Sequence, residues 1–301
     1  MRILIGVDGS PEADVACQFV ASRTWPKGTR VTLLGALEPA VDWAGPGVPG
    51  GNWLTMDTAA LSLVLDERAD TLRRAGLSVS TSVERGRPEA LLIQLASESF
   101  ADLIVVGSRG LGPVASAIRG SVSAFLVDHA GCPVLVVRSP EATRMLLATD
   151  GTESSLRIPR LLAGWGNAFR GLPVEILSVA PRDAFVTPWA AEHEAAGAME
   201  SDLVVHRRIA EQVADEMMEL GWHAAAAAVA GDPGREILAA EREWRADLIV
   251  TGSRGISTLR RIVAGSVAHD VLLHAHSSVL VMRGQVSARI RQAVTPFATP
   301  A

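Results

Sequence analysis

The sequence predicts an α/β fold in which two similar domains follow one another, each a doubly wound parallel sheet flanked by helices. The chain has 301 residues, and at about 150 residues per domain this length corresponds to two domains. A ten-residue segment occurs twice. Short runs of Ile, Leu and Val also alternate with amphipathic segments, which is typical of strands buried on both faces alternating with helices.

The internal repeat sets the domain boundaries. Residues 101–110 read ADLIVVGSRG and residues 246–255 read ADLIVTGSRG, so nine of ten positions are identical at an offset of 145. This period is too long for a solenoid and indicates two copies of a whole domain. We predict a first domain over residues 1–139 and a second over 143–284, called below the first and second halves. The tail, 285–301, is expected to be loosely ordered.

In the first half, five apolar runs predict strands and the amphipathic segments between them predict helices. The runs near residues 3–7, 103–106 and 134–137 are almost entirely Ile, Leu and Val, so these strands should be buried on both faces. Right-handed crossovers then make neighbouring strands parallel. The expected strands span residues 2–7, 31–37, 78–83, 103–107 and 133–138, and the expected helices span 12–23, 55–75, 88–100 and 121–129.

The second half follows the same pattern, but the secondary structure at Pro159 and at the alanine run 224–228 needs a separate argument. Pro159 lies inside its first expected helix, and it should kink or shorten that helix because proline lacks an N–H donor. The alanine run 224–228 has high helix propensity, but it lies between Gly221 and Gly231, which favours a strand. The expected strands are near residues 144–149, 174–179, 223–229, 247–251 and 278–282.

Composition excludes several classes of protein. Apolar residues make up 48% of the chain, charged residues 20%, and the net charge is −5. A long disordered protein would be more polar and more charged, and sequence-independent nucleic-acid binding needs concentrated Lys and Arg. Cys17 and Cys132 lie in apolar surroundings far apart in sequence. They indicate neither a disulfide framework nor a zinc site, and they fit a reducing compartment.

We expect a soluble, cytoplasmic protein without a membrane partner. Asp8 ends the apolar run that opens the chain, too early for a signal peptide. No apolar run approaches the ~20 residues that span a bilayer.

The most informative motif is a glycine loop that follows a buried strand and leads into a helix. Gly107 and Gly110 are followed after nine residues by Gly120-Ser121, giving the pattern G-x-x-G-x9-G-S. In open α/β sheets, ligands bind beyond the carboxyl ends of the strands, where the strand order reverses. Glycine lets the backbone approach a ligand, and the free N–H groups of the helix that begins at Ser121 suit a phosphate.

The same pattern occurs in the second half, at Gly252, Gly255, Gly265 and Ser266. Glycine at strand ends and serine at helix starts are also ordinary loop chemistry. The occurrence of the full pattern twice, at the same place in a strand–loop–helix unit, favours a nucleotide site in at least one half.

Charged residues beside these loops have two interpretations. Asp8 and Asp150 each follow the first strand of their half, where a carboxylate could accept a hydrogen bond from a ribose or base. Each could instead cap the following helix, a role that Ser10 and Thr152 also suit. Arg109 and Arg254 could pair with phosphate or could be solvated loop charges.

On these residues the chain resembles the universal stress protein family, in its nucleotide-binding branch. The resemblance covers nearly the whole chain and implies a five-stranded parallel sheet of order 3-2-1-4-5 in each half, with ATP, together with Mg²⁺, bound in the crevice. It also implies that backbone groups at Ala36 and Val179 help to hold adenine. The remaining residues expected to contact the nucleotide line the same pocket or follow Ser121 and Ser266: Val7, Val106, Val122, Thr149, Thr251 and Val267.

The resemblance also implies an assembly. Members of this family pair through their fifth strands, and the two halves could do so within one chain, making an intramolecular pseudo-dimer. Pairing of whole chains into a homodimer is left open. If only one half binds nucleotide, the odd Pro159 in the second half favours the first.

Three functions follow from these observations. The favoured one is an ATP-binding stress-response or signalling protein in which binding changes conformation or assembly. The chain has no G-x-x-x-x-G-K-[ST] loop and no obvious catalytic residue. The alternatives are a slow or partner-stimulated ATPase, with Asp8 or Asp150 orienting water, and an interaction protein that binds no nucleotide. His269, His274 and His276 could suggest a metal, but His129 aligns with His274, which favours a structural role at a helix end.

Overall fold

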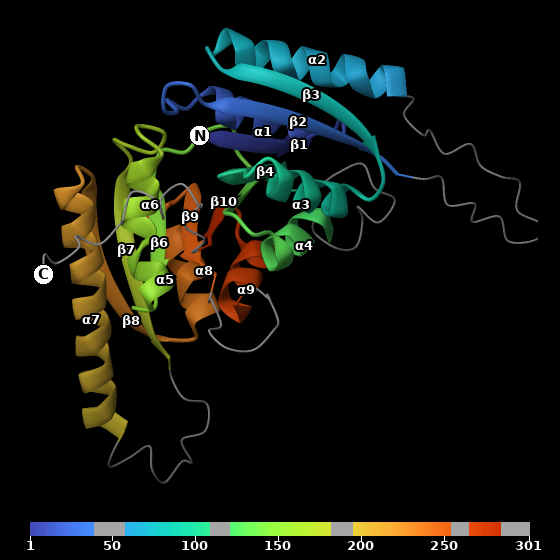
Figure 1. Cartoon of the computed structure of the whole chain (residues 1–301). Helices are drawn as coiled ribbons and strands as arrows, with labels where there is room; N and C mark the ends of the chain where they lie inside the picture. Colours follow the sequence, from blue (N-terminus) through green and yellow to red (C-terminus); the bar gives the residue numbers. More distant parts are fainter. Residues whose placement is uncertain (39–57, 109–120, 182–194, 254–264, 284–301) are drawn as a thin grey trace, which may run out of the picture.

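The structure is a computed structural model, and it describes residues 1–38, 58–108, 121–181, 195–253 and 265–283. Figure 1 shows a long twisted sheet with helices on both faces; the blue-to-green part of the chain forms one half and the yellow-to-red part the other.

The first half has the strands and helices that its apolar pattern predicts, with boundaries shifted by a few residues. Its strands are β1 (Arg2–Gly6), β2 (Arg30–Leu37), β3 (Ser78–Arg85), β4 (Leu103–Gly107) and β5 (Val134–Val137). Its helices are α1 (Pro11–Ala21), α2 (Thr58–Arg74), α3 (Pro88–Glu98) and α4 (Ser121–His129).

The second half repeats this order. Its strands are β6 (Met145–Thr149), β7 (Pro173–Pro181), β8 (His223–Gly231), β9 (Leu248–Gly252) and β10 (Ser278–Met282). Its helices are α5 (Glu153–Leu156), α6 (Ile158–Gly164), α7 (Ala195–Glu219), α8 (Pro233–Trp244) and α9 (Ser266–His274). The alanine run lies in β8, which confirms the strand prediction over helix propensity.

Pro159 divides the first helix of the second half, as predicted. α1 runs for 11 residues, whereas the matching segment is split into α5, of 4 residues, and α6, of 7 residues. Pro159 lies in the first turn of α6, where its missing N–H has no intrahelical partner to lose. Proline is therefore accommodated by starting a new helix around it.

Within the described residues, ten strands form one sheet in the order β3-β2-β1-β4-β5-β10-β9-β6-β7-β8. Each half therefore has the strand order 3-2-1-4-5, with parallel neighbours. The two fifth strands, β5 and β10, pair antiparallel, with Val136 opposite Val279 and Leu135 opposite Leu280. The intramolecular pairing implied by the family resemblance is thus present.

The two halves share their hydrophobic core on both faces of this sheet. Each face carries one apolar cluster that continues from the first half into the second. On the face covered by α1 and α6, Phe169 packs against rings of the first half: its ring centroid lies 5.9 Å from that of Trp25 and 6.4 Å from that of Phe19. Burial of aromatic surface is a main source of stability, so the junction is part of the fold's core.

Both cysteines lie inside this core with free thiols. Burial raises the pKa of each thiol, Cys17 and Cys132, to about 12. Among the described helices, none combines the length and apolar character that crossing a membrane requires.

Candidate functional site

The predicted site residues of the first half meet at one edge of the sheet. β1 pairs with β2 on one side and with β4 on the other, so the strand order reverses at β1. Val7 and Asp8 follow β1, and Ser108 follows β4, at the carboxyl ends of these parallel strands. This is the place where open α/β sheets bind ligands.

Asp8 shapes the turn between β1 and α1. Its Oδ1 accepts a hydrogen bond from the backbone N–H of Ser10, at 3.0 Å. Ser10 is the N-cap of α1, and its Oγ accepts from the N–H of Ala13, at 3.2 Å. Gly9 adopts the positive φ of +82° that the turn requires. Of the two capping candidates, Ser10 therefore caps the helix, and Asp8 holds the turn before it.

Gly107 allows α1 to pack directly on the end of β4. A Cβ atom at this position would lie 2.7 Å from the backbone carbonyl carbon of Glu12 and 2.8 Å from its Cβ. A side chain would push the first turn of α1 away from the carboxyl edge. Gly252 has more room, because the nearest atom to its added Cβ would be Ser155 Cα at 3.7 Å. The first glycine of the motif is thus required by close packing only in the first half.

In the second half, Asp150 holds the turn before α5 with more hydroxyl groups around it. Its Oδ1 accepts from the backbone N–H and the Oγ1 of Thr152, at 3.0 and 2.6 Å, and from the Oγ of Ser155, at 2.9 Å. Thr152 is the N-cap of α5, and Gly151 has φ of +72°. Both carboxylates therefore accept from the backbone N–H two residues later, and Asp150 also accepts from the hydroxyl groups of Thr152 and Ser155.

The expected pocket-lining residues lie at the strand ends. Val7, Val106, Thr149, Val179 and Thr251 are all buried, and Ala36 is half-buried. Val7 also extends the pairing of β1 with β2, since its N–H donates to the carbonyl of Leu34 at 2.9 Å.

The remaining predicted residues divide into two groups. Ser121 and Ser266 are exposed first residues of α4 and α9, followed by half-buried Val122 and Val267. Gly265 is the N-cap of α9 and supplies no side chain, so the first N–H groups of that helix have no side-chain cap. Five predicted ligands lie outside the described residues: Arg109, Gly110, Gly120, Arg254 and Gly255.

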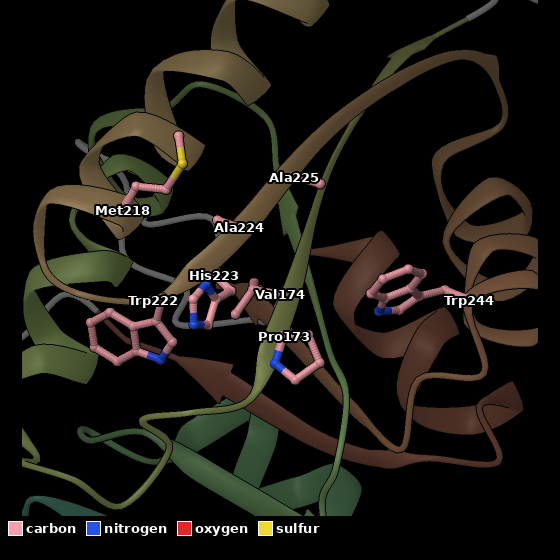
Figure 2. A pocket seen from close by; sticks show the side chains of 8 residues that line it. All are labelled: Pro173, Val174, Met218, Trp222, His223, Ala224, Ala225 and Trp244. Carbon is pink, nitrogen blue, oxygen red and sulfur yellow. The ribbon is translucent and has the colours of Figure 1, made fainter.

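Two described cavities lie at the opposite edge of the sheet. The larger, of about 280 Å³, is lined by residues at the amino ends of β7 and β8, among them Pro173, Trp222 and His223 (Figure 2). The other, of about 250 Å³, is lined by Asp247 and Ser277 near the amino ends of β9 and β10. Neither cavity includes a residue of the glycine motif.

The family model described as "Universal stress protein family" matches residues 1–138 and again residues 141–283. The chain belongs to the universal stress protein family. A universal stress protein of Mycobacterium tuberculosis is 28% identical over 302 residues, covering 93% of this chain and 96% of the relative.

A solved structure supports the fold. A universal stress protein from Archaeoglobus fulgidus, 19% identical, superposes with a TM-score of 0.63 and covers 94% of this chain and 96% of its own. Another solved universal stress protein, described as a complex with cAMP, is 25% identical, with a TM-score of 0.35, and covers 46% of this chain and 95% of its own.

Two histidines of this universal stress protein, His129 and His274, lie at the ends of helices α4 and α9. The Nδ1 atoms of His129 and His274 lie 2.9 Å from the backbone carbonyls of Phe125 and Asp270, one turn earlier in α4 and α9. These contacts agree with the predicted structural role. Among the described residues, no group of three or more His, Cys, Asp or Glu side chains could hold a metal ion.

The sequence reasoning missed two polar residues of the second half, Ser178 and His206. Their contacts reach the strand end that precedes Asp150. The repeat contains the signal, because the offset of 145 aligns His206 in α7 with Leu61 in α2. A comparison of the halves position by position would have revealed this exchange.

Proposed function

We propose that this universal stress protein binds an adenine nucleotide, ATP with Mg²⁺, at the carboxyl edge of each half. The observation that carries the proposal is the packing of Gly107 against Glu12 at the point where the strand order reverses. Because Gly107 has no side chain, backbone alone lies between the end of β4 and the first turn of α1, beside the turn held by Asp8. A backbone surface of this kind suits a phosphate chain.

Each part of the site has a role in this proposal. The first N–H groups of α4 and α9, at Ser121 and Ser266, donate hydrogen bonds to phosphate oxygens. The helix dipole favours the negative charge of the phosphate at the same place. Asp8 and Asp150 accept hydrogen bonds from the ribose or base. The buried strand ends and the backbone near Ala36 and Val179 contact adenine. Mg²⁺ commonly keeps several waters and binds through substrate phosphates, so it needs no cage of protein ligands here.

The proposed output is a change in conformation or assembly. Asp8 and Asp150 each accept hydrogen bonds from their own turn, which suits a binding role more than that of a mobile general base. In the ATPase alternative, Asp8→Ala abolishes turnover and leaves affinity intact. In the binding proposal, affinity falls with this variant.

A cytoplasmic location is a further part of the proposal, which leaves the pairing of whole chains into a homodimer open. The buried, free thiols of Cys17 and Cys132 are compatible with a reducing compartment.

The experiment that tests the function begins with the purified protein. It is denatured, the precipitate is removed, and released nucleotide is identified and counted by chromatography. One adenine nucleotide per half supports occupation of both sites, and ATP rather than ADP argues against rapid hydrolysis. If none is released, the protein is titrated with ATP and Mg²⁺. Absence of binding at millimolar concentrations would overturn the proposal and favour the interaction-protein alternative.

A further inference from the structure

The two halves differ systematically around the turn that carries the aspartate. Equivalent positions at the strand ends follow from the strand register, since Gly6 pairs with Leu34 in the first half and Ala148 pairs with Leu177 in the second. The repeat offset of 145 aligns Leu61 in α2 with His206 in α7. At four matched positions the first half has a side chain without a polar group, whereas the second has a hydroxyl or an imidazole. These pairs are Val7 and Thr149, Ala13 and Ser155, Gly35 and Ser178, and Leu61 and His206.

In the second half these polar groups connect α7 to the end of β6. The Oγ of Ser178 donates to the backbone carbonyl of Thr149 at 2.9 Å, and it lies 2.8 Å from Nδ1 of His206. Ser178 is completely buried. A serine hydroxyl has a single proton, and Ser178 gives it to Thr149. His206 must therefore carry its proton on Nδ1 and donate it to Ser178.

The connection continues from Thr149 to the carboxylate of Asp150. The Oγ1 of Thr149 donates to Ser155 Oγ at 3.1 Å, and Ser155 Oγ donates to Asp150 Oδ1 at 2.9 Å. The Ser155 hydroxyl also lies 3.0 Å from the carbonyl of Thr152, but the ionised carboxylate is the stronger acceptor. Each hydroxyl proton is thus used once. The two sets of hydrogen bonds meet at Thr149, whose backbone carbonyl accepts from Ser178 and whose side chain donates to Ser155.

The first half fills the same space with apolar side chains. A Cβ atom at Gly35 would lie 2.8 Å from Cδ2 of Leu61, so Leu61 occupies the volume that Ser178 and His206 share in the second half. α7 also lies directly on the turn that contains Asp150, since a Cβ at Gly151 would be 2.7 Å from Cδ1 of Ile209. α7 is therefore well placed to determine how this turn is held.

We propose that His206 is a positioning residue for the second site: through Ser178, Thr149 and Ser155 it fixes the orientation of Asp150 for nucleotide binding. This inference rests on the proposed function. Because Leu61 and Gly35 replace the two central members in the first half, the dependence on an imidazole is a property of the second site alone.

The first test examines the hydrogen bonds without nucleotide. Long-range ¹H–¹⁵N correlation spectra of the full-length, ¹⁵N-labelled protein distinguish the two tautomers of a neutral histidine. His206→Leu identifies the His206 signals by their loss. We expect the proton of His206 on Nδ1. A proton on Nε2 alone would contradict the direction of the hydrogen bonds and overturn the inference.

The second test measures nucleotide binding in each half separately. ATP with Mg²⁺ is titrated into the full-length protein while the backbone amide signals of Gly9 and Gly151 report the first and second sites. We expect His206→Leu to weaken binding at the second site about five-fold, the effect of one neutral hydrogen bond, and to leave the first site unchanged.

Two further variants separate positioning from packing. His206→Asn keeps an N–H donor near the place of Nδ1 and should restore most of the affinity. The double variant His206→Leu with Ser178→Gly reproduces the Leu61 and Gly35 pair of the first half. It should fold, since that pair already packs in this chain, and it should bind as weakly as His206→Leu.

The outcomes distinguish this inference from the proposed function. If the signals of both glycines show that the wild-type protein binds nucleotide at both sites, and His206→Leu binds as tightly at the second site, the positioning role is wrong while the proposed function stands. If the wild-type protein binds no nucleotide at either site, the proposed function fails, and this inference fails with it.

Discussion

Arg138 and Arg283 occupy equivalent positions after β5 and β10, and each donates a hydrogen bond to the last turn of the final helix of the other half. The guanidinium of Arg138 donates to the carbonyl of Leu272 in α9 at 2.6 Å and to that of Ser277 at 2.8 Å. The guanidinium of Arg283 donates to the carbonyl of Val127 in α4. A guanidinium at this place donates to carbonyls that lack an intrahelical partner, and its positive charge interacts favourably with the helix dipole.

The hydrogen bonds of Arg138 and Arg283 link each predicted phosphate-binding helix to the other half. α4 and α9 begin at Ser121 and Ser266 and end at the carbonyls that the two arginines bind. Arg283 is only 9% exposed, and burial lowers the pKa of its guanidinium, an effect opposed by the nearby Asp128. An arginine stays protonated even so, and the hydrogen bond from Arg283 to Val127 is made in a poorly solvated position.

Replacement of Arg138 tests this connection. Arg138→Met keeps much of the aliphatic stem but removes the donors to Leu272 and Ser277. We expect a loss of about 2–3 kcal/mol in the free energy of unfolding, since charged hydrogen bonds are lost and carbonyls are left without donors. Urea unfolding measures the change. Arg73→Met, in an exposed ion pair with Asp70, is the control and should change stability by less than about 0.5 kcal/mol. Equal effects of the two substitutions would contradict the proposed anchoring.

The matched glycines Gly107 and Gly252 provide a second test. Gly107→Ala brings a Cβ to 2.7 Å from the backbone of Glu12, whereas Gly252→Ala keeps 3.7 Å from Ser155. We expect Gly107→Ala to cost about 1–3 kcal/mol, as overpacked sites do, and to weaken nucleotide binding in the first half. Gly252→Ala should be close to neutral. Thermal unfolding and the amide signal of Gly9 during titration measure both effects; similar losses in the two variants would refute the asymmetry.

The buried thiols predict how stability changes at alkaline pH. Burial raises the pKa of Cys17 and Cys132 from 9.0 to about 12. Above pH 9 the unfolded chain releases these protons while the folded protein keeps them, so the stabilisation present below pH 9 is lost as pH rises toward 12. The slope is at most about 1.4 kcal/mol per pH unit for each thiol.

Urea unfolding between pH 8 and pH 10.5 measures this slope, with Cys17→Ala and Cys132→Ala as comparisons. Each variant loses stability at every pH because it leaves a small cavity, but it should lose less between the two pH values than the wild type does. An unchanged slope in both variants would show that the thiols do not titrate differently in the two states.

The local sequence pattern predicts much of the secondary structure of this chain. The apolar runs of residues 2–7 and 103–107 predict buried strands, the proline at position 159 predicts a broken helix, and the glycines around residues 224–228 predict a strand there. Each prediction depends on neighbouring residues, whose period and backbone constraints act within one element. Strand order required the resemblance to a family, because several orders bury the same runs.

The site was predicted less completely. Asp8, Gly107 and Ser121 stand out because they belong to a repeated motif beside a strand or helix end. The closer roles did not follow: Ser10, rather than Asp8, caps α1, and Gly107 is needed for the approach of Glu12. Arg109 and Gly110, which lie outside the described residues, stay predictions.

A tandem α/β repeat with a glycine motif in each half could be predicted from the amino-acid order, because hydrophobic period and repeat spacing are properties of the linear chain. The contacts between groups far apart in the chain became visible in the folded protein. Ser178 contacts His206 across 28 positions, and Arg138 contacts Leu272 across 134. Such contacts depend on how helices pack on the sheet and on the pairing of β5 with β10, which brings the end of each half against the last helix of the other.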